Sequence, residues 1–459
     1  MSALRLVTAA VSLGLIALAF YDDRFVGGGP GFGVSQALLL AAGVAIGALC
    51  AAPRAWNARA LTLLVSVALT LGVAELVLRV ALGPRYFTSI QLDPRLLYRP
   101  SPGSQREYTR AAINGGVRVR YAMNSQGYRG DELSARGESL RVVVYGDSFI
   151  MAEFSRTEDT FAERLELHLA QALGERVEVV NAGVAGYGPD QELRRMEAEL
   201  ESLRPDLVIA AIYAGNDFGD LLRNKLYRLS DDGGLRENRF SFDPAIERRV
   251  AVSRSELLLK KVLRDTLRRI SGAAGAGIPT GREARIERVE RSLEQLVREY
   301  HEYVVQGDDV VHELMSDPYN ADVSLAPGSD SARYRVALME QVIIRMRAGT
   351  DALRLPLLLV LIPSPIDVAD DHESGLVDAQ AHPAYRRTAL TDTLEQICLR
   401  QGIPALNLFG PFAAHGASQL YLKGVDDHWN EAGQDLAARL ASESVIAQGL
   451  IRARMEARP

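Results

Sequence analysis

Apolar residues are distributed very unevenly along the 459 residues of the chain. Three apolar runs lie at its start, at residues 6–21, 34–52 and 60–82. The second and third runs have the length that crosses a hydrocarbon core, about 17–25 residues, whereas the first also has the length of a signal-peptide core. Because two further runs follow at once, we favour a span for the first run as well. The pattern therefore predicts a membrane anchor of three helices over residues 1–82.

The positive charges around these runs predict the orientation of the chain. Arg5 precedes the first run, and Arg54 and Arg59 lie between the second and the third, whereas the loop after the first run carries one arginine against two aspartates. Lysine and arginine are enriched on the cytoplasmic side of membrane spans. We therefore expect a cytoplasmic N-terminus and an extracytoplasmic soluble part, periplasmic or extracellular. Within the third run, Glu75 and Arg79 are spaced to pair on one face of a helix.

After the third run the pattern changes to strands that alternate with helices. A polar stretch rich in proline, glycine and arginine comes first, at 83–140, with a short strand and turn at 121–130. Helices are predicted at 159–173 and 190–203, and strands at 140–146, 177–183, 205–215, 355–365 and 403–408. This alternation predicts a parallel five-stranded sheet with helices on both faces.

A long insertion separates the third predicted strand from the fourth. It covers about residues 221–350 and contains a Gly/Ala-rich linker at 271–281. The helix predicted after the linker repeats apolar residues every three to four positions, as at Leu293 and Leu296, which is typical of a packed helix face. We interpret the insertion as a helical cap or lid that divides the core into residues 141–220 and 351–459.

Charge and composition narrow the classes of function. The formal net charge of −6 leaves no basic footprint, so nucleic acid is excluded as a partner. The two cysteines, Cys50 and Cys398, lie in an apolar run and a predicted helix, and no spacing of cysteine and histidine indicates a disulfide or a metal site. We therefore expect neither a metal nor another cofactor.

Residues suited to a catalytic role follow the first three predicted strands. In an open parallel sheet, ligands bind beyond the carboxyl ends of the strands. Ser148 follows the first strand, Gly183 and Gly186 follow the second, and Asn216 follows the third. Each alone fits an ordinary cap, loop or turn. Because all of them fall on one rim of the sheet, together they predict a site with Ser148 as its nucleophile.

A serine nucleophile needs a base, because a neutral hydroxyl group is a poor nucleophile. Among the seven histidines, His428 has acids beside it in a compact polar turn, "VDDHWNEAGQ" at 425–434, just before a predicted C-terminal helix. We expect His428 to lie within hydrogen-bond reach of Ser148. In the same turn, Trp429 is expected to pack against the loop, and Asn430 to cap the helix that follows.

These blocks resemble the SGNH, or GDSL, hydrolase superfamily. The family's serine, glycine, asparagine and histidine blocks are matched in order by Gly146-Asp147-Ser148, Gly186, Gly215-Asn216-Asp217 and Asp426-Asp427-His428. The resemblance covers about 141–220 and 355–445. The stretch "NSQGYRG" at 124–130 and the Trp-Asn pair after the histidine look like membrane-anchored members similar to the alginate-acetylation type of acyltransferase and esterase. The resemblance implies a flavodoxin-like three-layer α/β/α core.

The resemblance also implies the role of each residue. Ser148 would attack an acyl carbonyl, and His428 would accept the serine proton and later deliver it. The oxyanion would be held by the backbone N–H groups of Ser148 and Gly186 and by the side-chain amide of Asn216, with Gly183 as the alternative to Gly186.

The acid that orients the histidine is less obvious. The family's common spacing, with an aspartate three residues before the histidine, fails here, whereas a variant spacing of two residues selects Asp426. An aspartate directly before His428 can less easily fold back to the ring, so we expect Asp427 to be a solvated or helix-capping neighbour. Asp147 and Asp217 are expected to hydrogen-bond the turns that carry the serine and the asparagine.

We interpret the chain as a membrane-anchored, extracytoplasmic serine ester hydrolase. Its expected partners are the membrane and an acyl or acetyl ester, either a small molecule or a group on an envelope glycan or lipid. One alternative is an O-acyltransferase that passes the acyl group to an envelope polysaccharide. The other alternative is a non-catalytic scaffold that binds envelope polysaccharide.

Overall fold

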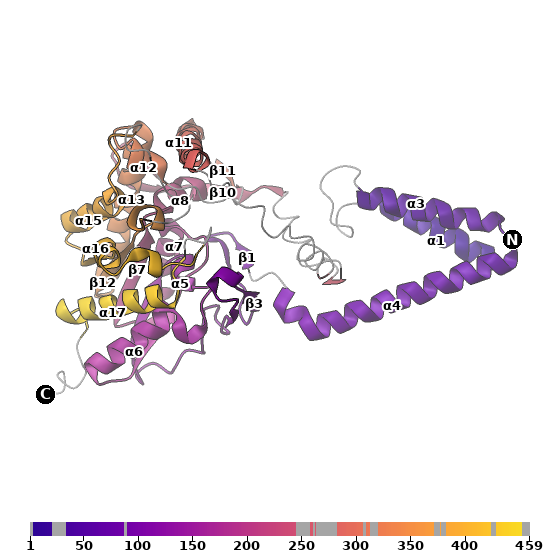
Figure 1. Cartoon of the computed structure of the whole chain (residues 1–459), viewed down its shortest axis with the longest axis horizontal. Helices are drawn as coiled ribbons and strands as arrows, with labels where there is room; N and C mark the ends of the chain where they lie inside the picture. The colour runs from indigo at the N-terminus through magenta and orange to yellow at the C-terminus, as the bar shows by residue number, and fades with distance from the viewer. Residues whose placement is uncertain are drawn as a thin grey trace. The chain divides into compact units, whose positions relative to one another are not determined.

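The computed structural model describes residues 3–20, 34–86, 90–244, 258–259, 262, 282–305, 309–312, 320–370, 377, 382–423 and 428–451. The chain divides into two compact units, each considered by itself. The first comprises 1–88 and 244–276, and the second comprises 89–243 and 277–459. Figure 1 shows the helices of the first unit in indigo to violet and those of the second from magenta to yellow.

The first unit contains the three apolar runs as the helices α1 (Ala3–Phe20), α3 (Val34–Ala48) and α4 (Arg54–Tyr86). Small residues let α1 and α3 approach closely. The Ser12 hydroxyl donates to the Gly43 carbonyl at 2.8 Å, and a Cβ at Gly43 would lie 2.7 Å from Ile16 Cγ1. This packing of small residues is typical of helices that pair within a membrane.

Among the described helices, two are long and apolar enough to cross a membrane, Ala3–Phe20 and Arg54–Val80. The expectation of three such helices is therefore corrected. The second run forms a 15-residue helix followed by the short 3-10 helix Leu49–Ala51. At about 1.5 Å per residue, α3 extends about 22 Å, which is less than a hydrocarbon core of about 30 Å.

The predicted pair of Glu75 and Arg79 is present in α4, with 2.6 Å between Arg79 Nε and Glu75 Oε1. The same carboxylate accepts hydrogen bonds from the backbone N–H groups of Leu258 and Leu259, each at 2.9 Å. Part of the predicted insertion therefore returns to the first unit.

The second unit is built on a five-stranded parallel sheet, which confirms the predicted sheet. Its strands run in the order β13 (Ala405–Asn407), β12 (Leu357–Ile362), β7 (Leu207–Tyr213), β5 (Leu140–Tyr145) and β6 (Val177–Asn181). Numbered along the chain from β5, this order is 5-4-3-1-2, so the direction of winding reverses between β5 and β7. Ligands bind at such a switch point in open α/β sheets.

The alternation of side chains along each strand builds two cores, one on each face of the sheet. Val142 and Val144 of β5 face one core, and Val143 and Tyr145 face the other. The first core is covered by α6 (Phe161–Leu173) and α17 (Glu431–Ala447), which lie side by side (Figure 1). The second core is covered by α7 (Pro189–Leu203), α8 (Asp217–Asn224), α13 (Asp330–Ala352) and α15 (Ala389–Gln401).

The insertion contains short strands as well as the expected helices, because β8 (Tyr227–Leu229) pairs with β9 (Leu235–Glu237), and β10 (Arg239–Phe242) pairs with β11 (Asp309–His312). Its helices are α11 (Arg282–Val305), α12 (Ala321–Leu325) and α13. The fully buried Arg335 joins them, since its guanidinium donates to Asp322 Oδ2 at 2.6 Å and to the Leu296 carbonyl at 2.9 Å. The expected linker at 271–281 lies outside the described residues.

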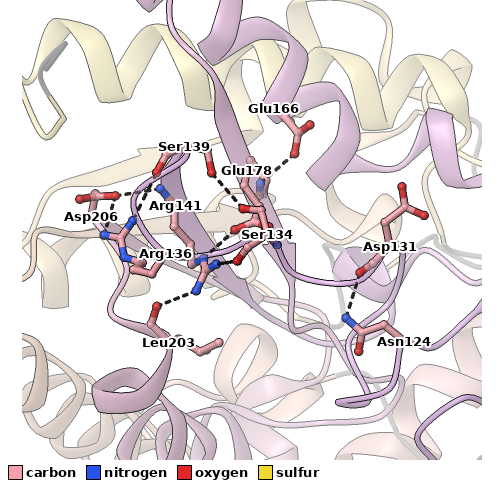
Figure 2. A network of polar contacts seen from close by, with 11 residues as sticks. Asn124, Asp131, Ser134, Arg136, Ser139, Arg141, Glu166, Glu178, Leu203 and Asp206 are labelled. Carbon is pink, nitrogen blue, oxygen red and sulfur yellow. Dashed lines mark hydrogen bonds and ion pairs between the residues drawn. The ribbon is translucent and has the colours of Figure 1, made fainter. Parts of the chain in front are cut away.

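The polar stretch before the core is folded and fastened to the sheet. It contains β1 (Ile90–Asp93), β2 (Leu97–Pro100), β3 (Gln105–Thr109) and β4 (Arg118–Ala122). Figure 2 shows how Arg141, at the start of β5, connects this stretch to its neighbours: Nε contacts Glu178 at 2.6 Å, and the guanidinium also donates to the carbonyls of Ser134 and Leu203. Polar contacts at the amino ends of β5 and β6 therefore connect the polar stretch to the core.

Candidate active site

Ser148 is the first residue of a one-turn helix, α5 (Ser148–Met151), that begins directly beyond β5. The turn into this helix depends on Gly146, because a Cβ there would lie 2.4 Å from Ile150 Cγ1. Asp147 caps the helix, since its Oδ1 accepts a hydrogen bond from the Phe149 N–H at 2.8 Å. Asp147 is buried and Ser148 is half-buried, so the hydroxyl lies at the surface of a rigid turn.

The structure brings His428 onto Ser148 across 280 residues of sequence. The distance between His428 Nε2 and Ser148 Oγ is 2.8 Å. The imidazole stacks on the Phe149 ring with 5.1 Å between centroids, and meets the Phe154 ring edge-on at 4.8 Å. Two aromatic walls therefore restrict the ring to an orientation that points Nε2 at the serine.

The residues after His428 support it as expected. Trp429 is fully buried and packs against Phe149 and Phe412, with ring centroids 5.1 and 5.6 Å apart. Asn430 caps α17, because its Oδ1 accepts hydrogen bonds from the N–H groups of residues 432 and 433 at 3.0 and 3.1 Å. The residue that follows Ser148 therefore joins His428 and Trp429 in one aromatic cluster, because Phe149 contacts both rings.

The two aspartates before the histidine, Asp426 and Asp427, lie outside the described residues. The two aspartates beside the other blocks behave as predicted. Asp147 holds the serine turn as given above, and Asp217 Oδ2 accepts a hydrogen bond from the Tyr213 N–H at 2.8 Å. Both carboxylates thus stabilise the backbone of the turns that follow β5 and β7.

The loop after β6 lies against the back of the serine turn. The Val184 N–H donates to the Gly146 carbonyl at 3.0 Å, and Asn181 Nδ2 donates to the Ile150 carbonyl at 2.8 Å. A Cβ at Gly183 would lie 2.4 Å from the backbone nitrogen of Met151, so only glycine fits there. The Gly183 N–H is already used, because it donates to Asn181 Oδ1 at 3.1 Å.

Gly186 lies further along the same loop with φ at 76°, a left-handed conformation that favours glycine. Tyr98, from β2, closes over this position. The Tyr98 hydroxyl group donates to the Ala185 carbonyl at 2.8 Å. A Cβ at Gly186 would lie 2.8 Å from the Tyr98 hydroxyl oxygen. The segment before the core therefore shapes the backbone of this loop, a contact that no local pattern in the sequence indicates.

Asn216 precedes α8 as its N-cap and is 9% exposed. Its side chain does not cap the helix, although asparagine commonly does so. Within the described part of the chain, its Oδ1 is buried and has no hydrogen-bond partner. The amide is therefore not committed to the helix that it precedes.

Arg129 belongs to the stretch "NSQGYRG" upstream of the serine block and connects this stretch to the end of α5. The side chain is buried, and its guanidinium donates to the carbonyls of Met151, Ala152 and Ser155, the last at 2.7 Å. Arginine at the carboxyl end of a helix satisfies carbonyl groups that lack partners within the helix. Burial lowers the pKa of Arg129 to about 10, so the group remains charged at neutral pH.

Buried carboxyl groups lie behind the site in the first turn of α7. Burial raises the pKa of Asp190 to about 7. Burial also raises the pKa of Glu192 well above its ordinary value, and the charge of Asp147 adds to the effect. No group of three or more histidine, cysteine or acidic side chains that could hold a metal occurs among the described residues.

Comparisons with known proteins returned solved structures alone, since no family model and no curated protein matches the chain. The chain is similar to a GDSL-like lipase from Bacteroides thetaiotaomicron, at 10% identity and a TM-score of 0.32, over 69% of this chain and 93% of the other. It is also similar to a lipase/acylhydrolase from Enterococcus faecalis, at 13% identity and a TM-score of 0.29, over 67% of this chain and 96% of the other.

A third similar structure is LAE5, an alpha/beta hydrolase from the metagenome of Lake Arreo, at 14% identity and a TM-score of 0.33, over 69% of this chain and 97% of the other. Likeness at this level carries no conclusion about activity or substrate.

Gly183→Ala tests the close approach behind the serine turn. The added Cβ meets backbone rather than a flexible side chain, so we expect the free energy of unfolding to fall by about 1–3 kcal/mol, as for other overpacked sites. Gly349→Ala is the matched control, because a Cβ there meets nothing within 4 Å and the position lies inside α13. Denaturant unfolding that ranks Gly349→Ala as equally destabilising would contradict the assigned contact.

Proposed function

We propose that the chain is a membrane-anchored serine ester hydrolase of the SGNH superfamily. The observation that carries this proposal is the 2.8 Å contact between Ser148 Oγ and His428 Nε2, at the carboxyl rim of a parallel sheet. A hydroxyl group hydrogen-bonded to an imidazole is the arrangement that activates a serine for attack on an acyl carbon. The order of the four sequence blocks supports the same assignment.

The reaction follows from the two side chains. As Ser148 Oγ bonds to the carbonyl carbon of an ester, its proton passes to His428 Nε2, and the carbonyl oxygen becomes an oxyanion. The tetrahedral intermediate collapses when the imidazolium gives the proton to the departing alkoxide, so an alcohol leaves and an acyl-serine remains. Water then attacks the acyl-serine with His428 as base, releasing the acid and restoring the hydroxyl group.

The proposed oxyanion hole consists of the Ser148 N–H, the Gly186 N–H and the side-chain amide of Asn216. Donors that are fixed before the reaction stabilise the developing charge, and removing one typically lowers turnover about 10²–10³-fold. Gly186 is preferred to Gly183, because the Gly183 N–H already donates to Asn181. Asn216 suits the role because its amide does not cap α8.

The proposed substrate is an acyl or acetyl ester, either on a small molecule or on an envelope glycan or lipid. We place the second unit outside the cytoplasm because of the arginines at positions 5, 54 and 59. In this placement α4 carries the chain out of the cytoplasm, with Arg54 and Arg59 at its cytoplasmic end.

Maleimide labelling tests this placement. Asp232→Cys adds a thiol at an exposed position of the second unit, and Ala55→Cys adds one at an exposed position in the first turn of α4. In cells with an intact cytoplasmic membrane, a membrane-impermeant maleimide should label Asp232→Cys, whereas Ala55→Cys should react only after lysis. The unaltered chain corrects for Cys50 and Cys398. Labelling of Ala55→Cys but not Asp232→Cys in intact cells would reverse the proposed orientation.

Turnover of p-nitrophenyl acetate by the full chain in detergent tests the nucleophile. Ser148→Ala should lower kcat by at least about 10³-fold, because loss of the nucleophile removes the covalent route. Ser202→Ala, at an exposed serine of α7, is the control and should leave kcat unchanged. A fluorophosphonate should label the unaltered chain at Ser148. Equal turnover by Ser148→Ala, or no labelling at Ser148, would leave the non-catalytic scaffold as the better reading.

The acid of the triad is proposed to be Asp426. Asp426→Asn should lower kcat by about 10²–10⁴-fold, because an amide stabilises the wrong tautomer of His428 and not the imidazolium. Asp427→Asn is the neighbouring control and should change kcat by less than about threefold if it only caps or faces solvent. If Asp427→Asn abolished turnover and Asp426→Asn did not, the assignment would pass to Asp427.

A further inference from the structure

Asn320 lies in the predicted insertion and is completely buried, at 0% exposed. Its contacts reach the turn after β7, about a hundred residues earlier in the chain. The Asn320 backbone N–H donates to the Gly215 carbonyl at 3.0 Å, and its Nδ2 donates to the Ala214 carbonyl at 3.0 Å. Its Oδ1 accepts a hydrogen bond from the Gly219 N–H at 2.8 Å. One residue of the insertion thus makes three hydrogen bonds to one turn.

These contacts are not explained by the helix that Asn320 begins. Asn320 is the N-cap of α12, a position where asparagine usually accepts a hydrogen bond from its own helix. Here the side chain makes no such bond, and both of its amide atoms are directed to the other segment. Because the side chain is fully buried, losing either partner would leave a polar group unsatisfied.

The three contacts enclose Asn216. Ala214 and Gly215 come directly before it, and Gly219 comes three residues after it, in the first turn of α8. Asp217 adds a fourth hydrogen bond within the turn, to the Tyr213 N–H. The backbone on both sides of Asn216 is therefore held, while its side chain does not cap the helix.

The insertion is rigid enough to act as such a support. Two residues after Asn320, the buried Asp322 carboxylate binds Arg335 and Ser331, each at 2.6 Å. A Cβ at Gly219 would lie 3.4 Å from Leu296 Cδ2 of α11, so α8 also packs directly on the insertion. The position of Asn320 is thus fixed by α11, α12 and α13 together.

We propose that Asn320 is a positioning residue for Asn216, and that the insertion thereby completes the oxyanion hole. This inference rests on the proposed function, because it assigns Asn216 as an oxyanion donor. The insertion then has a part in the chemical step itself, in addition to any role in covering the site. Asn320 does not touch the reacting atoms and acts through the turn at 214–219.

The test compares kcat and KM for p-nitrophenyl acetate in the full chain. Asn320→Ala should lower kcat about 10–100-fold with KM changed by less than about twofold, since a misplaced donor loses part of the 10²–10³-fold effect of a missing one. Asn320→Asp should behave similarly, because it keeps the acceptor for Gly219 but puts an oxygen opposite the Ala214 carbonyl. It provides a second variant if Asn320→Ala does not fold.

Two controls separate positioning from stability. Thr350→Ala removes a buried hydroxyl group at the far end of α13, whose hydrogen bonds stay within that helix, so it should lower stability but leave kcat within about twofold. In an Asn216→Ala background, Asn320→Ala should cause no further loss of kcat, because the donor that it positions is absent. A structural role alone would lower kcat equally in both backgrounds.

The outcomes distinguish this inference from the proposed function. If the unaltered chain is not labelled at Ser148 by a fluorophosphonate, the proposed function fails. If the unaltered chain is labelled, and both Asn320 variants keep full kcat or lose it equally with and without Asn216, the positioning role alone is overturned. A loss of kcat confined to the chain that retains Asn216 supports the positioning role.

Discussion

The hydrogen bond between Ser148 and His428 is the constraint on which the site depends. It joins the end of β5 to the turn before α17, across 280 residues of sequence. A contact of 2.8 Å tolerates little error, so the strands and helices that carry the two residues must be held firmly. The shared aromatic cluster of Phe149, His428 and Trp429 provides this rigidity, because Phe149, the residue after Ser148, packs on both of the other rings.

The turns around Ser148 are held by buried polar side chains. Asp147 caps α5, Asn181 binds the Ile150 carbonyl, and Arg129 binds the carbonyls at the end of the same helix. Backbone groups at the ends of strands and short helices have no partners within their own element. Each side chain satisfies such a group and fixes a turn at the same time. The buried polar residues thus fix the backbone of the turns that carry Ser148 and its neighbours.

Two segments outside the five-stranded sheet contribute to this rim. Tyr98 and Arg129 come from the polar stretch before the core, and Asn320 comes from the insertion. All of these residues belong to the second unit, so the site depends on the whole of that unit and not on the sheet alone. The parallel sheet alone provides only the edge on which they converge.

Much of this arrangement was predictable from the sequence, and the contacts across the chain were not. The strand periods, the apolar runs, the order of the four blocks and the capping role of Asn430 are local features, because burial and turn chemistry act on neighbouring residues. The length of α3 was misjudged, since an apolar run does not reveal where its helix ends. The contacts of Asn320, Tyr98 and Asn181 could not be predicted, because the identity of a polar residue does not indicate which distant turn its side chain binds. Local sequence patterns thus predict the helices and strands and the chemistry available at the strand ends. Which segment supports each turn emerges only in the folded chain, because it depends on the register of the sheet and on the packing of elements far apart in the chain.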